Sequence, residues 1–227
     1  MSRFSSTGLV ADGAGPAQIG VRFLDSVLRG VGQVMLQNNS YAGLIFLVGI
    51  CYNSLLFGLA ALVGTVVSTA TAMMLGVDRA HVWAGLFGFN GGLVAIALLF
   101  FLQPDPLTWI CVIFASACST IVMAAMLTLM GVWKVPALTA PFVFTSLTFF
   151  LATARFGRLQ STHLLPIAGL PKAVAVEGVV TASTIAEAVF NGIGQVFFQG
   201  SIVTGIFFAI GLVIVRESHA EWRSPVL

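Results

Sequence analysis

Charged side chains are scarce in this chain: they make up 8% of its 227 residues, whereas hydrophobic residues make up 58%. A typical soluble domain carries about 25% charged residues, so the composition excludes a protein that covers its surface with water-facing charge. The formal net charge of +2 is too small and too scattered for a nucleic-acid-binding surface. The composition therefore predicts an integral membrane protein.

Residues that carry catalytic or metal chemistry are also few. The sequence has three histidines and three cysteines, and the cysteines lie in apolar runs without the spacing of metal ligands. It contains no Gly-x-x-x-x-Gly-Lys motif that would cradle a nucleotide phosphate. We therefore predict no metal, no cofactor and no enzymatic activity.

Long stretches of the chain lack Asp, Glu, Lys and Arg altogether, the longest of them between Arg29 and Asp78. A helix needs about 20 residues to cross a bilayer, and this stretch has room for two. The apolar residues are continuous rather than alternating, which favours helices over a transmembrane β-barrel. The sequence thus predicts an all-α membrane protein with helices over residues 19–37, 42–52, 54–76, 84–101, 106–131, 137–154, 179–198 and 201–215.

Composition also divides the chain into five parts. Ser, Gly and Ala dominate the beginning, prolines and charges return after residue 155, and the end is charged again. We expect a flexible tail at 1–18, a first transmembrane repeat at 19–155, a polar linker at 156–177, the start of a second repeat at 178–216 and a charged tail at 217–227.

An internal repeat is the most informative pattern in the sequence. Residues 30–37 read GVGQVMLQ and residues 192–199 read GIGQVFFQ, an offset of 162 (192 minus 30). At the same offset Asp25 matches Glu187 and Gly43 matches Gly205. Duplicated halves are typical of channels and secondary transporters, which place the solute site between the repeats. The alternative is two similar helix-packing motifs, because Gly and Gln favour close helix contacts in lipid.

Three groups of residues could contact a solute. The first comprises Gln33, Leu36 and Gln37, which share one face of a helix. A glutamine in hydrocarbon needs a partner, which is either a neighbouring helix or a solute in a wet path.

The second group is the glycine-rich segment at 85–93, GLFGFNGGL. Four glycines in eight residues favour a break in the helix, and non-helical backbone at membrane depth occurs only inside protein or beside a cavity. This predicts a re-entrant or interrupted helix in which Phe89 and Leu93 face a pathway. The alternative is a glycine face packed on a neighbouring helix.

The third group is the segment 135–142, VPALTAPF, in which Thr139 lies between Pro136 and Pro141. Prolines leave backbone carbonyls without their usual helical donors. A threonine in an apolar helix usually bonds its own backbone, but a threonine flanked by prolines is better placed to line a polar path.

Together these motifs resemble the urea transporter family. The resemblance rests on LRGVGQV at 28–34 with QNN at 37–39, on GLFGFN at 85–90 and on LTAPF at 138–142. The linker and the second Gly-x-Gly-Gln-Val also fall where that family begins its second half. The resemblance covers nearly the whole chain, from about residue 19 to 215.

The resemblance implies a passive urea channel of the cell membrane with an inverted-repeat fold, usually a homotrimer with one pore per protomer. Each half of that fold has five spanning helices and a re-entrant segment. We expect the first half to be complete here and the second to comprise only its first two helices. By motif, the residues expected to bind urea or a similar small neutral amide are Gln33, Leu36, Phe89, Leu93, Thr139, Gln195 and Val196.

Two features depart from the family pattern. Leu36 stands where the family usually has phenylalanine, so one wall of the first slot becomes aliphatic. A second unit of the first unit's size would extend beyond residue 227, which raises the alternative of an inactive or assembly-only membrane subunit. A channel for another small neutral solute is also open. A proton-coupled transporter is a further alternative, although Asp25 and Glu187 are the only acids near the expected spans.

Overall fold

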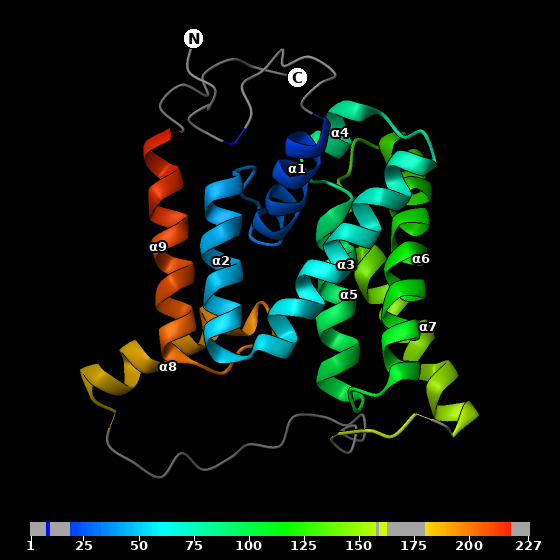
Figure 1. Ribbon diagram of the computed structural model, residues 1–227. Coiled ribbons are helices and arrows are strands. Elements are labelled where there is room, and N and C mark those ends of the chain that lie inside the picture. The colour runs from blue at the N-terminus through cyan, green and yellow to red at the C-terminus, as the bar shows by residue number, and fades with distance from the viewer. Residues whose placement is uncertain (1–7, 10–18, 158, 163–179, 219–227) are drawn as a thin grey trace.

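The computed structural model describes residues 8–9, 19–157, 159–162 and 180–218, and within these ranges the chain is helical (Figure 1). The tails expected at 1–18 and 217–227 and the linker expected at 156–177 lie largely outside the described residues. No β-strand forms in the described ranges, which confirms the all-α prediction. The helices are α1 (Ile19–Gln33), α2 (Ser40–Asn53), α3 (Leu55–Met74), α4 (Arg79–Trp83), α5 (Gly88–Phe101), α6 (Pro106–Gly131), α7 (Ala140–Phe156), α8 (Ala182–Gln195) and α9 (Ile202–Ser218).

Most helix ends agree with the expected ranges to within a few residues because local signals fix them. The Asn39 side chain accepts hydrogen bonds from the first turn of α2, and Ser54 does the same for α3. Pro106 occupies the first turn of α6, where its missing N–H costs nothing. Two helices end earlier than expected, at Gln33 and Gln195, because a left-handed residue follows each of them.

The glycine-rich segment combines both interpretations of its sequence. The break is real: residues 84–87 form a turn between α4 and α5, and Gly85 has φ +76°. The later glycines are helical and face α3 closely. A Cβ at Gly88 would lie 2.7 Å from Thr65 Cγ2, and one at Gly91 would lie 2.6 Å from the Gly64 carbonyl oxygen. A glycine face packed on a neighbour therefore exists alongside the interrupted helix.

The helices α2 and α9 are far apart in sequence and pack against each other. In Figure 1, α2 runs from the upper to the lower end of the view, and α9 runs back up beside it. Phe46 of α2 is fully buried against Phe208 of α9, with ring centroids 5.3 Å apart. The Thr204 hydroxyl donates to the Gly49 carbonyl at 3.0 Å. The α1–α2 pair and the α8–α9 pair thus share one hydrophobic core.

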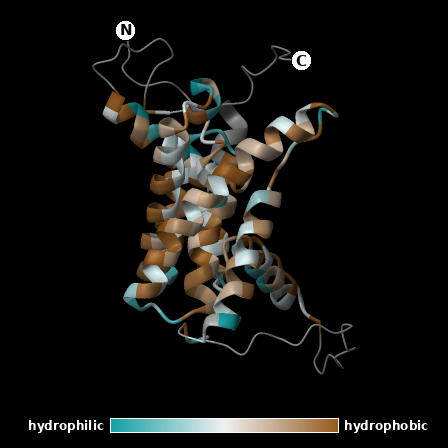
Figure 2. Ribbon diagram, turned by 90° about the vertical axis from the view of Figure 1, so that its right-hand side faces the viewer, coloured by the Kyte–Doolittle hydropathy of each residue, from teal (hydrophilic) through white to brown (hydrophobic). Residues whose placement is uncertain are grey.

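Hydrophobic residues extend along the helices, and hydrophilic residues gather toward the two ends of the bundle (Figure 2). Within the described ranges, α3 and α6 are long and apolar enough to cross a membrane. Shorter apolar helices occur at α2, α5, α7 and α9. This distribution agrees with the membrane class that the composition predicts.

Candidate functional site

Gln33 is the last residue of α1, and its side chain reaches a distant segment. Its Nε2 donates to the Ala84 carbonyl oxygen at 2.8 Å, so the half-buried glutamine joins the end of α1 to the turn before α5. A Cβ at Gly85 would lie 2.5 Å from the Gly30 backbone nitrogen, which shows how closely this turn approaches α1. Gln33 therefore has a protein partner for one amide hydrogen, and its amide oxygen has no partner among the described residues.

The chain reverses just after Gln33 in a turn with unusual backbone. Leu36 has φ +59°, a left-handed conformation that is uncommon for a leucine. Its N–H donates to the Gln33 carbonyl at 2.9 Å, and the Gln37 N–H donates to the Gly32 carbonyl at 3.1 Å. The turn leaves the Leu36 side chain 72% exposed.

The turn after α8 reproduces this geometry 162 residues later. Phe198 also has φ +59°, and its N–H donates to the Gln195 carbonyl at 2.9 Å. The Gln199 N–H donates to the Gly194 carbonyl at 3.1 Å. The side-chain Nε2 of Gln199 donates to the carbonyl two residues earlier, and so does that of Gln37. The sequence repeat is therefore a repeat of local structure.

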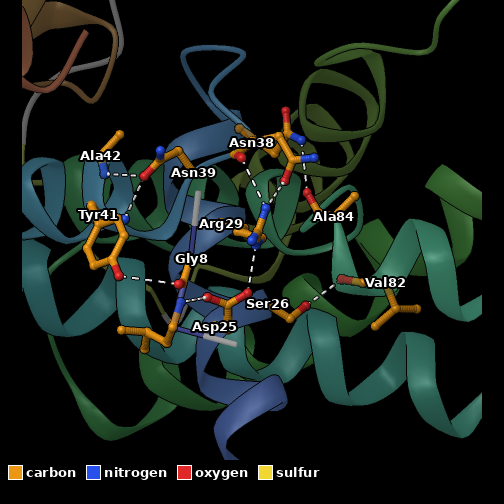
Figure 3. Close-up of polar contacts among 12 residues, drawn as sticks. Gly8, Asp25, Ser26, Arg29, Asn38, Asn39, Tyr41, Ala42, Val82 and Ala84 are labelled. Carbon is orange, nitrogen blue, oxygen red and sulfur yellow. Dashed lines mark hydrogen bonds and ion pairs between the residues drawn. The ribbon is translucent and has the colours of Figure 1, made fainter. Parts of the chain in front are cut away.

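A polar network holds α1 in place (Figure 3). The Asp25 carboxylate accepts from Arg29 Nε at 2.7 Å, and the pair is almost buried. Arg29 also donates to the Asn38 side chain at 2.8 Å, which ties the turn back to the helix. On the other side, the Leu9 N–H donates to Asp25 and the Tyr41 hydroxyl donates to the Gly8 carbonyl. These bonds fix the end of α1 on which Gln33 lies.

Phe89 and Leu93 lie four residues apart on α5 and are 5% and 4% exposed. Phe89 packs in a cluster with residues such as Phe87 and Met123, whereas Leu93 belongs to the main core. Leu93 shares this core with Val31 of α1 and Phe197 of the second turn. The helix α5 also reaches the second turn, where the ring centroids of Phe100 and Phe198 lie 5.5 Å apart.

Thr139 begins α7 at the N-cap position, directly after Leu138, and it is exposed. Asn90 of α5 holds the backbone on both sides of it. The Asn90 Nδ2 donates to the Leu138 carbonyl at 3.3 Å, and its Oδ1 accepts from the Phe142 N–H at 3.1 Å. Asn90 belongs to the glycine-rich motif, and the sequence motifs alone do not predict a role for it at the site. The sequence does contain an indication of this role. Asn90 is the one amide side chain in the apolar segment 84–101, and a buried amide needs hydrogen-bond partners.

Not all expected residues come together. Gln33, Phe89, Leu93 and Thr139 are joined through the Ala84 turn, α5 and Asn90. Gln195 and Val196 are exposed at the end of α8, and within the described part of the chain no hydrogen bond connects Gln195 to Gln33. Among the same residues, no group of three or more His, Cys, Asp or Glu side chains could hold a metal ion.

Comparison with known proteins decides the family. The family model described as "Urea transporter" matches residues 24–220, which is most of the chain. The chain belongs to the urea transporter family. This membership confirms the resemblance that the glutamine, glycine and threonine motifs indicated. It also agrees with the membrane protein that the composition predicts.

Individual urea transporters agree with the family match. Urea transporter 1 of Rattus norvegicus is 29% identical over 198 residues, which cover 86% of this chain and 51% of the rat protein. Urea transporter 1 of Ovis aries is 31% identical over 181 residues, which cover 78% of this chain and 47% of the sheep protein. The chain spans about half the length of the curated relatives it matches.

Proposed function

We propose that this chain forms part of a passive channel for urea or a similar small neutral amide. The observation that carries the proposal is the urea transporter family match over residues 24–220. It is supported by the position of the family-like motifs, because the Gln33 turn, α5 and the Thr139 segment adjoin one another around Ala84 and Asn90.

Seven side chains would contact the solute in this channel. Urea is flat and neutral, with four N–H donors and one carbonyl oxygen. A narrow slot of aromatic and aliphatic groups admits a flat molecule and excludes bulkier ones, and Leu36, Phe89, Leu93 and Val196 would form its walls. The oxygen atoms of Gln33, Gln195 and Thr139 would accept the urea N–H groups. These bonds replace the lost waters and offset a desolvation cost of several kcal/mol.

Ions would be rejected because the site has no charge to receive them. Asp25, the acid on the same helix as Gln33, is already paired with Arg29 at 2.7 Å. An ion entering the slot would lose its hydration without an opposite charge in return. Transport through the channel is therefore expected to be independent of pH and of sodium.

We further propose that the fold is an inverted repeat. Its first unit, at 19–155, would contain five spanning helices and a re-entrant segment. The second unit begins at 178 and contributes α8 and α9. The supporting observations are the matching turns after α1 and α8 and the opposite directions of α2 and α9 in Figure 1.

Partners and location follow from the same proposal. The protein would lie in the cell membrane as a multi-pass protein and assemble as a homotrimer, as the family resemblance implies. Exposed apolar side chains on α6 and α7 support contact with lipid, for example Ile110, Phe114, Phe144, Leu147 and Leu151.

The purified chain in liposomes tests the proposal. Vesicles exposed to a urea gradient should equilibrate faster than empty vesicles when followed by stopped-flow light scattering. The rate should be the same from pH 5 to pH 8 and with or without sodium. Equal rates in empty and loaded vesicles would favour the inactive or assembly-only subunit. If the vesicles equilibrate faster only with other neutral solutes, one of those solutes and not urea is the substrate.

A further inference from the structure

The N–H groups at the beginning of α7 have an unusual set of hydrogen-bond partners. The first turn of any helix has N–H groups without intrahelical partners. In α7 the Ala140 N–H donates to the Ala137 carbonyl at 3.1 Å, and Pro141 has no N–H. The remaining donor is the Phe142 N–H, which normally bonds the side chain of the N-cap residue. Thr139 is that residue, yet its hydroxyl makes no such bond.

Other helices of this chain show what a capping residue does. Asn39, Ser54 and Thr181 each accept a hydrogen bond from their own first turn. All three have extended backbone, with ψ between 112° and 165°. Thr139 differs, with φ −89° and ψ 6°, outside the extended region from which N-cap side chains bond the first turn.

Asn90 performs the capping from another helix. Its Oδ1 accepts the Phe142 N–H at 3.1 Å, and its Nδ2 donates to the Leu138 carbonyl at 3.3 Å. Asn90 is fully buried, so these bonds are shielded from water. It holds one residue on each side of Thr139, and Leu138 has a left-handed φ of +46°. Both bonds favour the backbone conformation in which the Thr139 hydroxyl is not used by the helix.

We propose that Asn90 caps α7 in place of Thr139 and thereby keeps the Thr139 hydroxyl free for the transported solute. Asn90 is a positioning residue: it acts through Thr139 and does not touch the solute. The inference deepens the proposed channel function, because a free hydroxyl at this position serves as one of the oxygen acceptors. Without Asn90, Thr139 rotates to the extended backbone and its hydroxyl turns back to the Phe142 N–H.

Thermal unfolding of the full chain in detergent tests the capping directly. Thr139→Val removes the hydroxyl and should change the Tm by less than about 1 °C, because that hydroxyl caps nothing. Ser54→Ala removes a working cap on α3 and should lower the Tm by roughly 2–4 °C, so it is the matched control. A Thr139→Val decrease as large as that of Ser54→Ala would overturn the proposal.

The double variant gives the second measurement. In the Asn90→Ala background Thr139 becomes the cap, so adding Thr139→Val should now lower the Tm by a further 2–4 °C or so. This change of effect between backgrounds is a coupling that simple loss of packing at Asn90 does not produce. Equal effects in both backgrounds contradict the proposal. If Asn90→Ala fails to fold, the comparison of Thr139→Val with Ser54→Ala still decides.

Urea flux in liposomes connects the capping to transport. Thr139→Val removes the hydroxyl and Asn90→Ala turns it back to the helix, so each should slow urea flux. The double variant should be no slower than the stronger single variant, because both changes take the same hydroxyl from the solute. Coupled Tm values with unchanged flux in every variant would uphold the cap and overturn the transport role of Thr139. Additive Tm values with slowed flux would uphold the channel and overturn the cap.

Discussion

The ends of α1 and α8 have the same local backbone but different surroundings. Each is followed by a left-handed residue with φ +59° and by three matching backbone hydrogen bonds. Yet α1 packs against α2, α3, α4 and α5 and buries most residues from Asp25 to Gly32, whereas in α8 Gly194 is the buried residue and α9 is the main neighbour. A short glycine–glutamine motif thus encodes the turn, while burial depends on helices elsewhere in the chain.

The charged pair shows this difference most clearly. Asp25 and Arg29 are bonded and nearly buried on α1. The matching positions on α8 carry Glu187, which is exposed, and Asn191, whose Oδ1 has no partner among the described residues. The ion pair therefore belongs to the packed setting of α1 and not to the repeated turn.

The largest expected effect comes from breaking that pair. Arg29→Met leaves the Asp25 carboxylate buried without its cation and should lower the free energy of unfolding by about 3–5 kcal/mol. Asn191→Met, at the matching position of α8, should not lower it, because no bond is lost and a buried oxygen without a partner is removed. Denaturant unfolding in detergent measures both. Similar losses for the two variants would remove the distinction between α1 and α8.

A smaller difference in stability is expected between alanine variants of two glycines, Gly43 and Gly205, at the matching helix crossings. A Cβ at Gly43 would collide with the Leu28 carbonyl oxygen, and a Cβ at Gly205 would collide with the Phe190 carbonyl oxygen. Gly43→Ala should cost about 2–3 kcal/mol because the neighbours of α1 prevent it from moving away. Gly205→Ala should cost about 1 kcal/mol or less because α8 can shift. The Tm of each variant in detergent tests this order, and the reverse order would contradict it.

The smallest expected effect concerns the two glutamines. Gln33→Leu removes the donor to the Ala84 carbonyl and should cost about 1 kcal/mol of stability. Gln195→Leu should cost almost nothing, since that side chain is exposed. Under the proposed function both variants slow urea flux. Tm and liposome flux, measured together, therefore separate the structural role of Gln33 from the transport role proposed for both glutamines. Loss of flux in Gln33→Leu alone would limit the site to the first turn.

Much of the helical framework was predictable because charges, prolines and caps mark its ends. The sequence predicts a helix at about 106–131, and α6 has these bounds, because Asp105 precedes the run and its apolar residues are continuous. The sequence does not predict the short helix α4, because five residues are too few to display a helical pattern of apolar residues. The left-handed Leu36 was not expected either, because leucine rarely adopts this conformation and the sequence predicted helix through residue 37.

The contacts of the expected site residues could not be predicted from the sequence. The repeat singled out Gln33 without its bond to Ala84, which lies 51 residues away and depends on tertiary packing. The two prolines direct attention to Thr139, but the proposed role of its hydroxyl depends on Asn90, which is 52 residues from the Phe142 N–H that it accepts. Sequence patterns report neighbours along a helix, and these bonds join different helices.

The pairing of α2 with α9 constrains how the protein is made. The carbonyl of Gly49 meets the hydroxyl of Thr204, 155 residues later in the chain. At a synthesis rate of roughly 5–20 residues per second, the ribosome needs about 8–30 s to cover that distance. During this time the Phe46 face of α2 has no α9 to cover it, so lipid, the insertion machinery or a chaperone must shield it. The helix α9 therefore completes the packing of a helix that was synthesised long before it.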